Sequence, residues 1–212
     1  MKKIKNGRKG ITLISLVITI VILLILAGIS IYMLTQTNLF EKAKQAKEIT
    51  EIAEFDEKIK IYQMEAQVEN KTLKEIMEDN GYLNIDDINE LETNGILTKN
   101  NKFILISNFN GLKELSKNVN RGIDYEGKAV YLINDIDCKN TFNEETGELI
   151  EGENFEPIGN SNSKIEDENK EGSVKYEFNG TFDGCNYTIK NLYIEKNETT
   201  DFCTALFGYV GE

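Results

Sequence analysis

Two aspartates near the middle of the chain have the spacing of a carboxylate pair. Asp135 and Asp137 flank the apolar Ile136, so on a strand both carboxylates lie on one face and the isoleucine on the other. Paired carboxylates can act as acid and base in glycoside cleavage, or they can bind Ca²⁺. Asp side chains also cap sharp backbone corners. The pattern favours a role in capping a backbone corner over a catalytic role, and a Ca²⁺ site at these two residues is kept as a hypothesis.

Composition limits the remaining chemistry. The 212 residues include no His, which excludes Ser-His-Asp and Cys-His catalysis and the usual zinc sites. The three cysteines, Cys138, Cys185 and Cys203, form no C-x-x-C pair. We therefore expect no catalytic residue, no cofactor and, apart from the Ca²⁺ hypothesis above, no metal. Free thiols pack as small apolar side chains, so we expect buried cysteines, with one disulfide as the alternative.

Three tyrosines also have a chemical interpretation. Aromatic rings with a polar tip can form a platform on which a carbohydrate stacks, and core packing is the simpler alternative. We favour core packing for all three, which are Tyr187, Tyr193 and Tyr209.

Charge is distributed unevenly along the chain. The net charge is −12, yet five basic residues lie within positions 1–10, and no acidic residue precedes Glu41. Without those five, 19 basic residues remain against 36 acidic ones, a net charge of −17. Such a chain repels nucleic acid, so we expect no nucleic-acid partner.

The basic cluster is followed by an apolar segment that is long enough to cross a membrane. Residues 11–34 carry no charge and, at about 1.5 Å per residue, extend about 36 Å as a helix, against a hydrocarbon core of about 30 Å. The preceding basic residues place the N-terminus in the cytoplasm and the rest of the chain outside. A cleaved secretory signal is the alternative, with Ala27–Ser30 as the nearest cleavage site, but the apolar run is longer than such signals usually have.

The junction between the basic leader and the apolar segment, Lys9–Val17 (KGITLISLV), resembles the leader junction of type IV prepilins and pseudopilins. That family has a short basic leader, Gly, a hydrophobic residue, Thr-Leu, a Glu at the fifth mature position and a long apolar helix. The resemblance implies cleavage after Gly10 by a prepilin peptidase and methylation of the new N-terminus at Ile11. Ser15 replaces the family's Glu, so processing and anchoring are implied, and assembly with pilin-like subunits is left open.

The segments after the membrane span read as helices and then as a hairpin. Within 41–70, apolar residues at helical spacing predict an amphipathic helix that packs on the segment after it, with a coiled-coil partner helix as the alternative. The residues of the expected apolar face are Ala46, Ile49, Ile52, Ala53, Ile59, Tyr62 and Ala66. Thr72 and Glu75 form a predicted capping box for a short helix. A second helix is expected from about Asp86 to Thr93, closed by Asn-Gly, and a β-hairpin is expected at 96–106.

From residue 108 the pattern changes to short apolar runs that alternate with Asn, Asp and Gly. After a short helix at 112–118, these runs suit a solenoid of β coils, because Gly and Asn adopt the left-handed backbone of tight corners most easily. A polar insertion at 160–177 predicts a surface loop. The region resembles the GLUG-motif family of bacterial surface proteins, whose repeats are thought to form a right-handed β-helix. The matching pieces are Gly111–Leu115, Gly127–Asp137, Phe155–Gly159, Phe178–Gly184, Tyr187–Leu192 and Ala205–Gly208.

Two features depart from that family's pattern. Ala205 stands where Gly usually precedes Leu-Phe-Gly, and about two coils fit before Glu212, whereas a solenoid usually stacks three or more units. We expect either further repeats or a partner at the open edge.

The sequence thus predicts an α+β protein in five parts. These are a basic leader at 1–10, a transmembrane helix at 11–34, an amphipathic helix continuing outward at 35–70, a small α/β connector at 71–107, and the start of a right-handed β-helix at 108–212.

The function expected from these parts is non-enzymatic. We expect a single-pass membrane protein, with its N-terminus in the cytoplasm, that displays a β-helical adhesion or binding module at the cell surface. Its expected partners are membrane lipid, a prepilin peptidase, pilin-like subunits, and a surface protein or glycan ligand. The alternatives are a minor pseudopilin of a type II secretion, type IV pilus or DNA-uptake system, and a β-helix enzyme that acts on surface polysaccharide.

Overall fold

The computed structural model describes residues 13–36, 39–162, 174–195 and 204–211. The chain divides into two compact units, Met1–Glu48 and Ile49–Glu212. The first contains the apolar helix α1 (Leu13–Gln36) and the beginning of α2 (Leu39–Glu69). In α1 the hydroxyls of Thr19 and Ser30 donate to backbone carbonyls one turn earlier, at 2.7 and 2.8 Å, which satisfies them without water.

The second unit begins inside α2, whose later turns are part of its core. Phe55, Ile59, Tyr62 and Ala66 are buried at i, i+4, i+7 and i+11, which places them on one helix face. The structure has a helix where the sequence predicted one, and the expected Ile59, Tyr62 and Ala66 lie on its buried face. Phe55 belongs to this face, whereas the expected Ala46, Ile49 and Ala53 are exposed.

The two short helices that follow are capped as expected. In α3 (Leu73–Asp79) the Glu75 amide donates to the Thr72 hydroxyl at 3.2 Å, and the Thr72 amide donates to the Glu75 carboxylate at 2.7 Å. α4 (Ile85–Asn94) has a second capping box and ends at Gly95, whose φ of +74° only glycine adopts readily. These caps satisfy backbone groups that short helices otherwise leave unpaired.

A four-stranded sheet follows, with the order β1-β2-β3-β9. The expected hairpin is confirmed, because β1 (Ile96–Lys99) and β2 (Phe103–Ile106) pair antiparallel around left-handed Asn100 and Asn101. Helix α5 (Phe109–Val119) comes next, slightly longer than the predicted 112–118. β3 (Ala129–Leu132) pairs parallel with β2, and β9 (Thr181–Asp183) pairs parallel with β3.

Parallel contacts recur farther along the chain. β4 (Ile136–Asp137) pairs parallel with β10 (Ile189–Lys190), and a parallel bridge joins Ile158 to Phe207. The separations between partners in the sequence are similar: 52 residues for Ala129 and Thr181, 53 for Ile136 and Ile189, and 49 for Ile158 and Phe207. The chain therefore runs in the same direction at each of these three pairs of partners.

The remaining strands form two small hairpins. β5 (Thr141–Phe142) pairs with β6 (Leu149–Glu151), and β7 (Asn160–Asn162) pairs with β8 (Val174–Tyr176), both antiparallel. The expected surface loop begins and ends at the β7–β8 hairpin, and its residues 163–173 lie outside the described residues.

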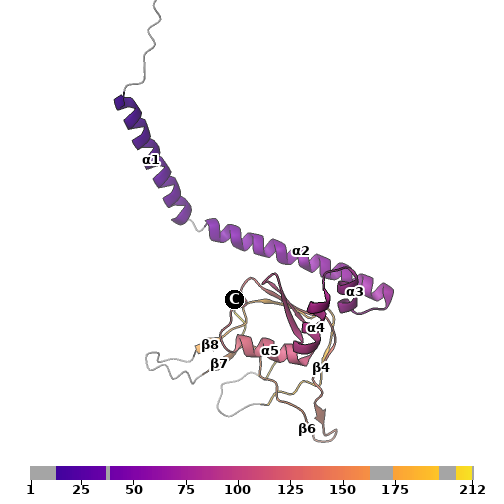
Figure 1. Cartoon of the computed structure of the whole chain (residues 1–212). Coiled ribbons are helices and arrows are strands. Elements are labelled where there is room, and N and C mark those ends of the chain that lie inside the picture. Colours follow the sequence, from indigo (N-terminus) through magenta and orange to yellow (C-terminus); the bar gives the residue numbers. More distant parts are fainter. Residues whose placement is uncertain (1–12, 37–38, 163–173, 196–203, 212) are drawn as a thin grey trace, which may run out of the picture. The chain divides into compact units, whose positions relative to one another are not determined.

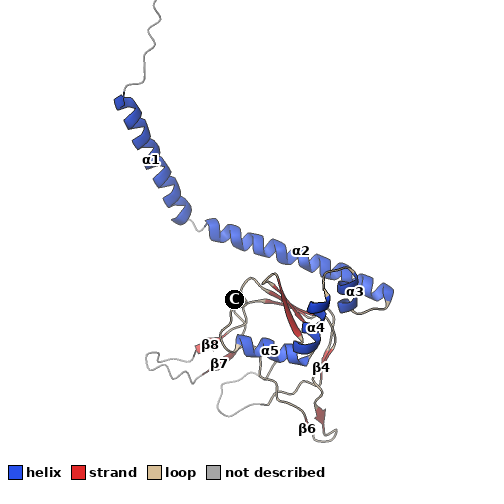
Figure 2. Cartoon of the chain, in the orientation of Figure 1, coloured by secondary structure: helices blue, strands red, loops and turns tan. Residues whose placement is uncertain are grey.

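Two apolar cores lie on opposite faces of the sheet. One face packs against α2, α3 and α4, and the other packs against α5 (Figures 1 and 2). Successive strand residues therefore alternate between the two cores. Phe55 of α2 stacks on Phe103 with ring centroids 4.2 Å apart, and the Tyr131 hydroxyl donates to Asp56 of α2 at 2.6 Å. The described residues thus form a mixed α+β fold in which connector and C-terminal segment share both cores.

A close approach of two glycines joins the neighbouring segments. The Gly208 amide donates to the Ile158 carbonyl at 2.9 Å, and a Cβ added at Gly208 would lie 2.3 Å from the Gly159 carbonyl oxygen. Both glycines therefore allow the segments to pack at backbone contact.

Candidate functional site

The residues expected to direct processing lie at the edge of the described chain. Gly10 and Ile11 are outside the described residues, so cleavage and methylation stay predictions. Ser15 is in the first turn of α1, and its backbone carbonyl accepts the hydrogen bond from the Thr19 hydroxyl. The side chain at this position is neutral and cannot provide the charge of a carboxylate.

The predicted membrane segment is a continuous helix. Leu13–Tyr32 is 20 residues long, has a mean hydropathy of 3.0 and has no side chain buried against the rest of the protein. At about 1.5 Å per residue, its length of about 30 Å equals the thickness of a bilayer's hydrocarbon core. It is thus long and apolar enough to cross a membrane.

Asp135 and Asp137 lie on one exposed edge, as expected, and Ile136 between them is fully buried. The Asp135 carboxylate accepts from the Thr188 amide at 2.8 Å. The Asp137 carboxylate accepts from the Asn191 side chain at 2.9 Å and from the Lys139 amide at 2.8 Å. These bonds, that to Asn191 foremost, lower the pKa of Asp137. Both carboxylates therefore tie the β4 segment to the β10 segment.

These contacts explain the aspartate pair as a structural feature. No group of three or more His, Cys, Asp or Glu side chains within the described ranges is placed to hold a metal ion. The Ca²⁺ site at Asp135 and Asp137 stays a hypothesis.

Two of the cysteines are buried thiols, as expected. Cys138 lies in the core under α5 and Cys185 in the core under α2, on opposite faces of the sheet, and both are free. Burial raises the pKa of Cys138 to about 11 and that of Cys185 to about 12. Both thiols are therefore protonated and unreactive near neutral pH. Cys203 lies outside the described residues.

The three tyrosines have different neighbours. Tyr187 packs against both cores, and its hydroxyl accepts from the Leu73 amide at 3.1 Å. Tyr193 lies beside Phe142 with ring centroids 6.0 Å apart, and Tyr209 is half-buried. These contacts favour the packing interpretation over a shared stacking platform.

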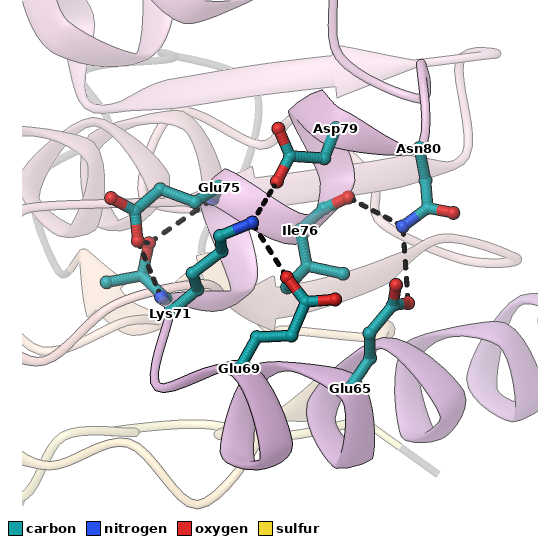
Figure 3. A network of polar contacts seen from close by, with 8 residues as sticks. Glu65, Glu69, Lys71, Glu75, Ile76, Asp79 and Asn80 are labelled. Carbon is teal, nitrogen blue, oxygen red and sulfur yellow. Dashed lines mark hydrogen bonds and ion pairs between the residues drawn. The ribbon is translucent and has the colours of Figure 1, made fainter.

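A polar network at the junction of α2 and α3 was not expected from the sequence (Figure 3). The Lys71 ammonium lies between Glu69 and Asp79, at 2.7 and 2.8 Å from their carboxylate oxygens, and these two bonds raise the pKa of Lys71. The hydrogen bonds of its capping box lower the pKa of Glu75. The network links charges from two helices, and only the capping box has a local sequence signal.

A cleft of about 460 Å³ lies beside this network, and we call it the amide cleft. It lies where the C-terminal end of α2 meets the turn Gly184–Tyr187, in which Cys185 and Asn186 have φ of 50° and 62°. Its lining includes four amide side chains and a tyrosine, which are Gln63, Gln67, Asn70, Asn186 and Tyr187. These come from distant parts of the sequence, so no motif indicated the cleft.

Comparisons of the chain with models of known protein families, with curated proteins and with solved structures found no match.

Proposed function

We propose that this chain is a membrane-anchored protein of the bacterial cell envelope. A pilin-like N-terminal helix holds it in the membrane, and a β-helical module outside the membrane binds a surface ligand without catalysis. The observation that carries the proposal is the position of α2 between the apolar helix and the core of the second unit. It follows the apolar helix after two residues, and its later turns supply Phe55, Ile59, Tyr62 and Ala66 to the core of the second unit. A helix used in this way can present the module at a membrane.

The charge distribution supports the orientation. Positively charged flanks stay on the cytoplasmic side of a membrane span, and the five basic residues of the first ten precede the apolar helix. The acidic remainder carries a net charge of −17 and is repelled by anionic lipid headgroups. Both features favour a cytoplasmic N-terminus and a module held away from the bilayer.

The strand register supports a β-helical module. β2, β3 and β9 lie in parallel succession, β4 pairs with β10, and Ile158 pairs with Phe207. Parallel partners separated by 49–53 residues are what two stacked coils produce, with α5 packed over one core at the start. A right-handed winding is part of the proposal.

The hydrogen bonds of Asp135 and Asp137 favour a binding role over catalysis. An acid–base pair needs carboxylates that reach a substrate. Here Asp135 and Asp137 bond to Thr188, Lys139 and Asn191, and thereby hold two segments together.

Mass spectrometry of the N-terminal peptide tests the pilin-like part of the proposal. The protein should be purified from membranes of a bacterial host that has a prepilin peptidase. We expect loss of residues 1–10 and a methylated Ile11. Gly10→Val adds a side chain at the cut and should leave the leader attached, and Gly7→Val is the matched control that should be processed normally. An intact Met1 in the unchanged protein contradicts pilin-type processing.

A further inference from the structure

We infer that the amide cleft binds a neutral saccharide. The inference rests on the proposed function, since it names the ligand class of the binding module. The cleft's volume of about 460 Å³ lies within the range of about 300–1,000 Å³ that is usual for small-molecule sites.

Unused amide groups are the first observation. Gln67, Asn70 and Asn186 are exposed, and within the described part of the chain their side-chain amides bond to no other protein group, which leaves them open to solvent or to a ligand. Gln63 donates its Nε2 to the Cys185 carbonyl at 2.8 Å, and its Oε1 stays available as an acceptor. A primary amide offers two donors and an acceptor, which match the donor and acceptor character of sugar hydroxyls.

Fixed geometry is the second observation. The Tyr187 hydroxyl is held by the Leu73 amide at 3.1 Å, so its half-buried ring has a defined position at the cleft. Asn186 lies in a tight turn, and Asn70 ends α2 with a left-handed backbone. An aromatic ring beside amide side chains on fixed backbone can contact the apolar face of a sugar ring while the amides bind its hydroxyls.

Charge balance indicates that the ligand is neutral. Among the residues that the structure describes, two charged ones line the cleft, Lys71 and Glu75, and both are engaged elsewhere. Lys71 is paired with Glu69 and Asp79, as Figure 3 shows, and Glu75 accepts two hydrogen bonds from Thr72. An anionic or cationic ligand would therefore meet no free countercharge in the lining.

Asn70 and Asn186 permit a clean test, because glycine can replace an asparagine in the left-handed conformation without strain. Asn70 and Asn186 have φ of 54° and 62°, so Asn→Gly at each removes the amide and keeps the turn. Asn101 has φ of 57° in the β1–β2 hairpin and does not line the cleft. Asn101→Gly is therefore the matched control.

Binding should be measured with the full chain in a detergent that has no sugar headgroup. The probes are cellotriose, chitotriose, mannotriose and lactose, with a sulfated heparin fragment as the charged comparison. We expect at least one neutral probe to bind, with little change between low and high salt. The double variant Asn70→Gly/Asn186→Gly should weaken that binding about tenfold, the loss expected when two hydrogen bonds are removed. Gln67→Ala should also weaken it.

Three results would overturn the inference. These are no binding of any neutral probe, binding only of the heparin fragment, or neutral binding that the double variant and Asn101→Gly affect equally. Tyrosine circular dichroism of each variant confirms that it is folded. Any of these results would leave the proposed pilin-type processing untouched, because processing is measured separately on the N-terminal peptide.

Discussion

Replacing Phe55 by Ala removes the ring at the centre of the contact between α2 and the sheet. Phe55 is 5% exposed, stacks on Phe103 at 4.2 Å, and meets Tyr131 edge-on at 5.1 Å. Losing a buried Phe costs about 3–5 kcal/mol through the transfer of the ring and the cavity left behind. Each aromatic contact is worth about 0.5–1.5 kcal/mol of that loss. We expect Phe55→Ala to lower the free energy of unfolding by about 4 kcal/mol.

The assay is urea unfolding of the full chain in micelles, followed by tyrosine circular dichroism because the chain has no Trp. Ile61→Ala is the matched control, since Ile61 lies on the same helix and is 54% exposed. Its effect should stay within about 0.5 kcal/mol. If Phe55→Ala also stays within about 0.5 kcal/mol of the unchanged protein, α2 is not a core element and the basis of the proposed function is wrong.

Three further predictions concern the segments that α2 supports. Gly208→Ala should lower the urea midpoint of unfolding markedly, because the added Cβ would lie 2.3 Å from a backbone oxygen. Gly184→Ala is the control and should leave the midpoint unchanged, because its Cβ would lie 3.9 Å from the nearest atom. Equal effects of the two substitutions would contradict the close packing at Gly208. The lowered pKa of Asp137 means that its contribution to stability is present above its unfolded pKa of about 3.9 and is lost as pH falls through the folded pKa. Asp137→Asn should therefore show a smaller loss of unfolding free energy below about pH 4, and an unchanged pH dependence would count against its bonds. Maleimide at neutral pH should leave Cys138 and Cys185 unlabelled in the folded protein and label both in urea, as measured by peptide mass. Labelling of these two cysteines in the folded protein would show that they are not buried.

Local signals predicted the local structure well. The capping box at Thr72 and Glu75, the Asn-Gly end of α4 and the β1–β2 hairpin each depend on residues only a few positions apart. In such cases the side chain that directs the backbone lies next to it in the sequence. The apolar helix α1 is of the same kind, because its uncharged length is read directly from the residues.

Long-range packing could be predicted only in part. The pairing of β3 with β9 joins residues 52 positions apart, and nothing in either strand specifies its partner. The position of Phe55 shows the same limit. Helical periodicity predicted Ala53 on the buried face, whereas the structure places Phe55 there, stacked on Phe103 of the sheet. Tertiary contacts thus decide between faces that local patterns leave equivalent.

Some features of the candidate site could likewise be predicted from the sequence, and others could not. The spacing of Asp135 and Asp137 correctly indicated that both carboxylates share an edge, and their partners Thr188 and Asn191 lie more than 50 residues later. The amide cleft had no sequence signal, because Gln67 and Asn186 meet only once α2 has packed beside the β9–β10 turn. Its amides are ordinary surface residues until the fold gathers them.

Labelling of intact cells tests the central claim, an anchored protein with its module outside, most directly. Glu144→Cys places a thiol on an exposed residue before β6, and Cys203→Ser removes the native cysteine whose surroundings are not described. We predict that a membrane-impermeant maleimide labels this variant in intact cells as fully as in lysed cells. Labelling that appears only after lysis would place the module in the cytoplasm and contradict the account.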